Sequence, residues 1–290
     1  MQRSLKLAGL TPLMDLTRGR PEIVIGLIDG PVAMGHPDLT GASFRNLSGK
    51  NGSCDQASST SCLHGTYIAG ILVAKRDSVA PAICPQCHIL LRPIFAESAA
   101  GTDQMPNATP EELAGAITEC VDAGARLLNL SVALSRPSAR GGRRLEEALD
   151  YAASRGVIPV AAAGNQGTLG SSAITRHQWV IPVIAYDAQG RPLGYSNLGK
   201  SIGTRGLGAP GDNVASLGVN DRPLSLSGTS VAVPFVTGAI ALLWSEFPAA
   251  SPAQVKLAIS QPQGPRRAAL VPPLMNAWGS YEFLRRNFSS

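Results

Sequence analysis

Short runs of apolar residues alternate along this chain with longer segments in which apolar positions recur every three or four residues. The runs are rich in β-branched side chains, as is typical of parallel strands that are buried on both faces. The segments have the period of helices that cover a sheet. Strands are predicted at 23–28, 88–94, 126–132, 157–163 and 179–185, helices at 63–74, 110–123 and 145–155, and a loop rich in Gly, Ser and Asn at 35–61. The alternation predicts right-handed βαβ units, and therefore an α/β fold with three αβα layers around a mostly parallel, doubly wound sheet.

One helical segment departs from the amphipathic pattern. Residues 231–244 are apolar on nearly every side, with only Thr237 polar, so this helix is predicted to run through the core. We expect Pro234 to lie in its first turn, where the missing N–H would have no helical partner in any case. Ser230 then lies at or near the helix N-terminus. There it is either a simple cap, or a nucleophile beside backbone N–H groups and the positive end of the helix dipole.

The composition favours one well-packed domain. Hydrophobic residues make up 44% of the 290 positions and charged residues 16%, and no linker divides the chain. We expect a single domain over 1–290, with an N-terminal lead at 1–20 and a C-terminal extension at 261–290 packed on it. The net charge of +5 forms no dense basic stripe, which argues against a nucleic-acid partner. No export signal or membrane span is visible, so we expect a cytoplasmic protein with no membrane partner, unless a secretion signal has been removed.

The five cysteines leave the sulfur chemistry open. Cys54 and Cys62 flank a serine-rich loop, Cys84 and Cys87 form a CxxC, and Cys120 falls in a helical pattern. Because the number is odd, at least one thiol is free or pairs with another molecule. The first four could bind a metal, but one CxxC is a weak signal, and disulfides or inert thiols account for them as well. We expect no metal and no cofactor.

Polar residues with complementary chemistry stand at the ends of the predicted elements. Asp29 follows a buried strand, His64 opens a helix, and Ser230 opens the apolar helix. Each alone has a structural explanation, such as a turn residue or a cap. Together a carboxylate can support a histidine cation, the imidazole can accept the serine proton, and the serine can attack a carbonyl. Asn165, at another strand end, adds an amide donor suited to an oxyanion.

These residues stand in segments that resemble the subtilisin-like serine proteases. The matching stretches are 24–30, 35–39, 64–70, 161–165 and 227–234. The likeness covers residues 20 to 260, and the order of the motifs and their place at strand and helix ends agree with it. It implies a subtilisin-like fold, an acyl-enzyme on the serine, and peptide or protein substrates. By this resemblance Asp29, His64 and Ser230 form the catalytic triad and Asn165 the oxyanion hole.

The same resemblance indicates where the substrate binds. Residues 131–134 and 162–164 are similar to the two backbone segments that flank the primary specificity pocket, beside which an extended peptide adds a strand. The candidate substrate-binding residues are Ser131, Val132, Ala133, Ala162, Ala163 and Gly164. Many secreted members hold calcium in a loop after the histidine helix. Here Lys75–Ser78 offers one carboxylate, so the resemblance implies no calcium site.

Within the family, the chain looks most similar to the cyanobactin-maturation proteases, which remove the leader from ribosomally made precursor peptides. The supporting stretches are 10–16, 84–87, 92–95 and 273–279. The macrocyclising relatives carry a helical insertion between the aspartate and histidine motifs, and this chain has no room for one. Leader cleavage by simple proteolysis is therefore favoured. The alternatives are a subtilisin-like protease of broad specificity, a transpeptidase or macrocyclase, and a non-enzymatic peptide-binding pseudoprotease.

Overall fold

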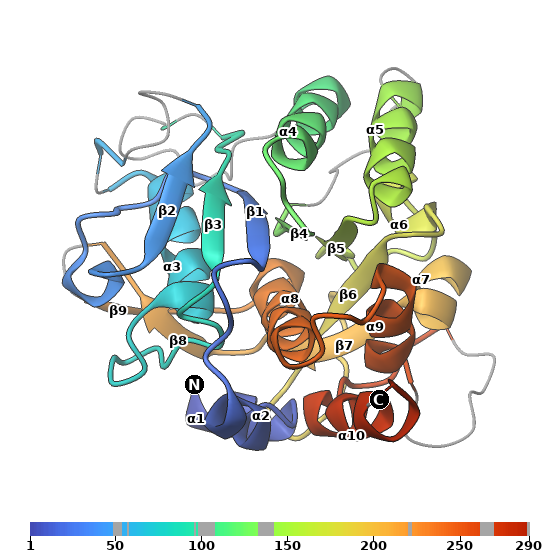
Figure 1. The fold of residues 1–290 in the computed structure, drawn as a ribbon. Helices are drawn as coiled ribbons and strands as arrows, with labels where there is room; N and C mark the ends of the chain where they lie inside the picture. The colour runs from blue at the N-terminus through green and yellow to red at the C-terminus, as the bar shows by residue number, and fades with distance from the viewer. Residues whose placement is uncertain are drawn as a thin grey trace.

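The structure is a computed structural model that describes residues 1–48, 54–56, 58–95, 97, 108–132, 142–219, 222–261 and 270–288 (Figure 1). The helices are α1 Gln2–Leu7, α2 Thr11–Leu16, α3 Thr60–Val73, α4 Pro110–Asp122, α5 Gly142–Ser154, α6 Ala173–Arg176, α7 Lys200–Arg205, α8 Thr229–Glu246, α9 Pro252–Ile259 and α10 Ala277–Phe288, with a 3-10 turn, η1, at Pro37–Leu39. The strands are β1 Val24–Ile28, β2 Ser43–Asn46, β3 His88–Leu91, β4 Leu127–Leu130, β5 Ile158–Ala162, β6 Ile181–Tyr186, β7 Leu207–Pro210, β8 Val214–Leu217 and β9 Pro223–Leu226.

A seven-stranded parallel sheet in the order β2-β3-β1-β4-β5-β6-β7 forms the centre of the molecule. Strand order reverses on either side of β1, because β3 lies next to it on one side and β4 on the other. In a doubly wound sheet of this kind, ligands bind at the carboxyl ends of the strands near such a reversal. The predicted three-layer, doubly wound fold is confirmed.

Helices cover both faces of this sheet, as Figure 1 shows for α4 and α5 on one side and α8 on the other. Alternation along β4 assigns neighbouring residues to opposite faces. Leu127 packs in the larger core cluster with the residues of α3 and α8, whereas Leu128 packs in a second cluster with those of α4 and α5. Every residue of β4 is buried, and all of them except Asn129 are apolar, as is typical of a strand covered on both faces.

Helix α8 is the central helix of the fold. In the part of the chain that the structure describes, it alone has the length and apolar character of a membrane span, and 89% of that window is buried inside the protein. This burial is that of a core helix. The prediction that Pro234 occupies the first turn is wrong, because the helix begins at Thr229 and Pro234 is its sixth residue. Ser230, the second residue, lies at the helix N-terminus as predicted.

The first and last helices lie along the base of the molecule in Figure 1, where α10 packs against α2. Leu5, Leu13 and Leu284 are buried in the same core cluster as α8. The backbone N–H of Ala277 donates to the carbonyl of Ala8 at 2.9 Å. The lead at 1–20 and the described part of the 261–290 extension therefore contribute to the main core.

The cysteines divide into a bonded pair and buried thiols. Cys54 and Cys62 form a disulfide, whereas Cys84, Cys87 and Cys120 are free and buried. Burial raises the pKa of the Cys120 thiol to about 12, so it stays protonated and inert at neutral pH.

Candidate active site

The site begins where β1 delivers Asp29 to the carboxyl edge of the sheet. The Asp29 side chain is fully buried, and its Oδ1 accepts hydrogen bonds from the Gly30 N–H at 2.6 Å and from His64 Nδ1 at 2.7 Å. Gly30 lets the start of α3 come close. A Cβ at this position would lie 2.0 Å from the carbonyl oxygen of Ser61, which is closer than real Cβ contacts. The glycine after the aspartate therefore allows the helix that carries His64 to pack against the strand end.

His64 links the carboxylate to the serine. Its Nδ1 is bound to Asp29, and its Nε2 lies 3.1 Å from Oγ of Ser230. Helix α3 begins at Thr60, so the prediction that His64 opens the helix is corrected: it lies in the second turn. The helix starts before the apolar pattern does, because its first residues, Thr60 and Ser61, are small and polar. Asp29, His64 and Ser230 come together in the arrangement of a nucleophile, a base and an orienting group.

The charge of Asp29 controls the protonation of His64. Burial by itself would lower the pKa of His64, but the negative charge of Asp29 and the hydrogen bond to it raise the pKa by more. The pKa of His64 therefore lies above its ordinary value of 6.5. A carboxylate that stabilises the imidazolium in this way favours transfer of the serine proton to Nε2.

Asn165 follows β5 and turns its side-chain amide toward Ser230. The N–H and the hydroxyl of Thr229 both lie 2.9 Å from Asn165 Oδ1 and donate to it. A backbone N–H can only donate, so these contacts fix the oxygen on the Thr229 side and leave Nδ2 as a donor for another acceptor. A Cβ placed on Gly228 would lie 3.3 Å from that Nδ2 and 3.4 Å from Ser230 Oγ. The amide donor and the hydroxyl therefore border one small space, where an oxyanion would form.

Two residues that the sequence analysis did not select hold this arrangement. Thr229 binds Asn165 and also accepts a bond from the Gly164 N–H at 3.2 Å. Asn197 accepts from the N–H groups of Gln166 and Thr168 at 3.1 and 3.0 Å and donates to the carbonyl of Ala163 at 3.1 Å. Thr229 lies within the serine motif, where its place next to Ser230 was a signal. Asn197 lies in a polar loop, and no local pattern distinguishes it.

The candidate substrate-binding residues lie at the ends of two neighbouring strands. Ser131 and Val132 follow β4, Ala162 ends β5, and Ala163 and Gly164 come next. The strands pair in parallel, with Leu130 opposite Ala161, so the two segments leave the sheet side by side. The described members are all buried, listed here as Ser131, Val132, Ala162, Ala163 and Gly164. Ala133 lies outside the described residues.

A buried polar network supports the first of these segments from below. Asn129 on β4 is fully buried, and its Nδ2 donates to Oγ of Ser131 at 2.8 Å. Its Oδ1 accepts a hydrogen bond of 3.0 Å from the hydroxyl of Thr237. Thr237 is the polar residue that interrupts the apolar surface of α8. Because each of these contacts satisfies a buried polar group, the network ties the serine helix to the candidate pocket wall.

Fold and site geometry together define a subtilisin-like protein, and the chain belongs to the subtilase family, whose sequence profile matches residues 20–267. It is 31% identical over 234 residues to a thermophilic serine proteinase of Bacillus sp. (strain AK1), and the aligned region covers 80% of this chain and 54% of that protein. It is 31% identical over 246 residues to subtilisin DY of Bacillus licheniformis, with 82% of each chain covered. The chain spans about half the length of the first relative.

Solved structures show which kind of subtilase this chain resembles. The protease domain of PatA superposes with a TM-score of 0.83 at 31% identity, over 94% of this chain and 98% of that one. The prenylagaramide maturation protease PagA gives a TM-score of 0.82 at 30% identity, over 95% and 98%. The PatG macrocyclase domain, at 21% identity and a TM-score of 0.80 over 98% and 97%, shares the fold. The resemblance to cyanobactin-maturation proteases is confirmed.

Proposed function

We propose that this protein is a serine endopeptidase that cleaves peptide bonds through an acyl-enzyme on Ser230. The observation that carries the proposal is the continuous relay from Asp29 Oδ1 through His64 to Ser230 Oγ, with contacts of 2.7 and 3.1 Å. Membership of the subtilase family supports it. A pseudoprotease would have no evident use for an activated hydroxyl, so hydrolysis explains this geometry better than peptide binding alone.

Each group has a definite part in the reaction. His64 takes the proton of Ser230 as the hydroxyl oxygen attacks the peptide carbonyl, and Asp29 stabilises the imidazolium that results. The carbonyl oxygen becomes an oxyanion, which accepts a hydrogen bond from Asn165 Nδ2. His64 then gives its proton to the leaving amine. Water, activated by the same imidazole, hydrolyses the acyl-enzyme and releases the second product.

For the substrate, we propose the leader segment of a ribosomally made precursor peptide. The support comes from relatives over nearly the whole chain: two structures bear the names patellamide maturation protease PatA and prenylagaramide maturation protease PagA. The peptide would lie extended between the segments after β4 and β5, bound through main-chain hydrogen bonds. Product analysis in the presence of an added amine separates hydrolysis from transpeptidation, because a transpeptidase would form the amide with that amine.

A fluorophosphonate serine probe tests the proposed function. We expect mass spectrometry to find one probe adduct on wild-type protein, located on Ser230, and no adduct on the Ser230→Ala variant. Ser227, which lies on the same turn but not in the relay, provides the matched control, since Ser227→Ala should label as wild type does. Folded wild-type protein that fails to label would contradict the endopeptidase assignment.

Replacing Asn165 by alanine is expected to reduce kcat by about 10²–10³-fold, the loss measured in subtilisin itself when the corresponding amide donor is removed. KM should change little, because the amide binds the oxygen only once negative charge has developed. Steady-state kinetics on a peptide substrate measure both constants. Full activity in the Asn165→Ala variant would remove this residue from the oxyanion hole.

The pH profile of kcat/KM reports the protonation of His64 in the free enzyme. Catalysis needs the neutral imidazole, and the pKa of His64 is raised above 6.5 by Asp29. Activity should therefore rise with pH through a midpoint above 6.5 and fall away below it. A midpoint clearly below 6.5 would show that burial, and not the carboxylate, dominates the protonation of His64.

A further inference from the structure

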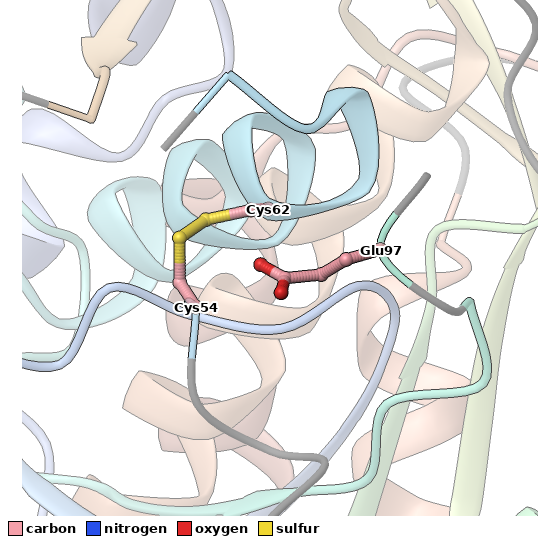
Figure 2. Close-up of side chains that lie close together, drawn as sticks. All are labelled: Cys54, Cys62 and Glu97. Atoms are coloured by element: carbon pink, nitrogen blue, oxygen red, sulfur yellow. A yellow bond between two sulfur atoms is a disulfide. The ribbon is translucent and has the colours of Figure 1, made fainter. Parts of the chain in front are cut away.

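A cluster of potential metal ligands lies beside the helix that carries His64. Cys54 and Cys62 form a disulfide, and Figure 2 shows the carboxylate of Glu97 turned toward the two sulfur atoms. One ligand atom from each of the three residues lies within 4.8 Å of the other two. Among the residues that the structure describes, no other group of three or more His, Cys, Asp or Glu side chains meets this criterion.

Two of the three groups are placed so that they favour metal binding after reduction. Cys62 is the third residue of α3 and is fully buried. The positive end of a helix dipole stabilises a thiolate in the first turn, and the thiolate is the form that binds metals. Cys54 is half-buried, so a reductant can approach the disulfide from its side.

Glu97 is held in place by the loop that carries Cys54. Its Oε1 accepts hydrogen bonds from the N–H groups of Asp55 and Gln56, both at 3.0 Å. The carboxylate thus stays beside the sulfurs whether or not they are bonded to each other. After reduction, the sulfurs need only separate to about 3.8 Å, the distance between two sulfurs bound to one tetrahedral zinc ion.

We propose that, in the reduced protein, Cys54, Cys62 and Glu97 bind one Zn²⁺ ion, with a fourth position open to water. Zinc binds thiolate and carboxylate ligands in proteins. Calcium and magnesium prefer harder ligand sets made of oxygen atoms alone. A phosphine reductant supplies two electrons to the disulfide and is itself oxidised, taking its oxygen from water, whose two protons protonate the two thiols. Zinc then displaces those two protons as two metal–sulfur bonds form.

The zinc site takes over the connection that the disulfide makes. In either state the loop at 54–56 is tied to the first turn of α3, two residues before His64. The metal adds a bond to Glu97, which follows β3 in the sequence. The histidine helix therefore keeps an anchor under reducing conditions, where the disulfide is lost.

The test is a titration of the full chain carrying Ser230→Ala, which prevents self-digestion. The protein is reduced with a phosphine, freed of reductant and titrated with Cd²⁺, whose thiolate complexes absorb in the ultraviolet; Zn²⁺ then competes for the site. We expect one Cd²⁺ per reduced chain, displaced by Zn²⁺, and none per oxidised chain. Glu97→Gln should weaken Cd²⁺ binding at least about tenfold. Loss of a residue that only supports a metal ligand already lowers metal affinity by about that factor.

The buried pair Cys84 and Cys87 provides the matched control, because it also places two thiols close together. The Cys54→Ser variant should lose the absorption band, whereas the Cys84→Ala variant should keep it. Binding that survives in Cys54→Ser, binding that disappears in Cys84→Ala, or a reduced and folded chain that takes up no Cd²⁺ would each overturn the proposal. Glu97→Gln keeps the shape and the backbone bonds of the glutamate, so it tests the site without removing a sulfur.

Discussion

Replacing Ser230 by alanine is expected to lower kcat by about 10⁶-fold, the loss measured in subtilisin when its nucleophile is removed. The hydroxyl is the attacking group and lies 3.1 Å from the base His64, and no other group takes its place in the proposed mechanism. Progress curves on a fluorogenic peptide, with circular dichroism to confirm folding, measure the effect.

The double variant Ser230→Ala with His64→Ala makes this test sharper. If the two residues act as one unit, the double variant is no slower than either single variant. Losses that multiply would mean that His64 and Ser230 act independently, and the relay seen in the structure would not be the catalytic one.

The Asp29→Asn variant is expected to lose about 10⁴-fold in kcat, as in the serine protease for which this change has been measured. The amide keeps the size of the carboxylate, so the fold should survive, but it can no longer stabilise the imidazolium. The pKa of His64 should also fall, because burial then acts without the opposing charge of Asp29. The acid limb of the pH profile of kcat/KM, measured on the residual activity of the variant, should move to lower pH.

A matched control for this variant is Asp187→Asn. The Asp187 carboxylate is also largely buried, and it accepts a hydrogen bond from the Arg191 N–H, which is the main cause of its lowered pKa. None of its hydrogen bonds is to a relay residue. Its replacement should leave the acid limb in place. An unchanged acid limb in Asp29→Asn would mean that the carboxylate does not set the protonation of His64.

The sequence predicted the five inner strands of the sheet because they are buried on both faces, and it missed the two edge strands, β2 and β7. Runs such as 24–28 and 158–162 are apolar throughout, and burial on both sides of a parallel sheet requires this. Strand β2, Ser43–Asn46, was missed because it is short and lies at the sheet edge, where its residues are exposed or half-buried. Its polar sequence is therefore that of a loop.

The site could be predicted only as far as its motifs reach. Asp29 and Asn165 follow strands, Ser230 lies at a helix N-terminus and His64 lies in the second turn of its helix, and their order along the chain is recognisable. The contact between Thr229 and Asn165 joins residues 64 positions apart, so it depends on how the strand ends converge. Pro234 was placed wrongly because the small residues Thr229 and Ser230 extend the helix ahead of its apolar part.

The contact between the two chain ends has a practical consequence for engineering. Ala277 is bonded to Ala8, and α1, α2 and α10 share the base of the molecule in Figure 1. A linker that crosses the base of the molecule could therefore join the last helix to the first, and the chain could be reopened in an exposed loop. Such a circular permutant would retain every strand and helix that positions Asp29, His64 and Ser230, and both new termini could carry a fusion partner.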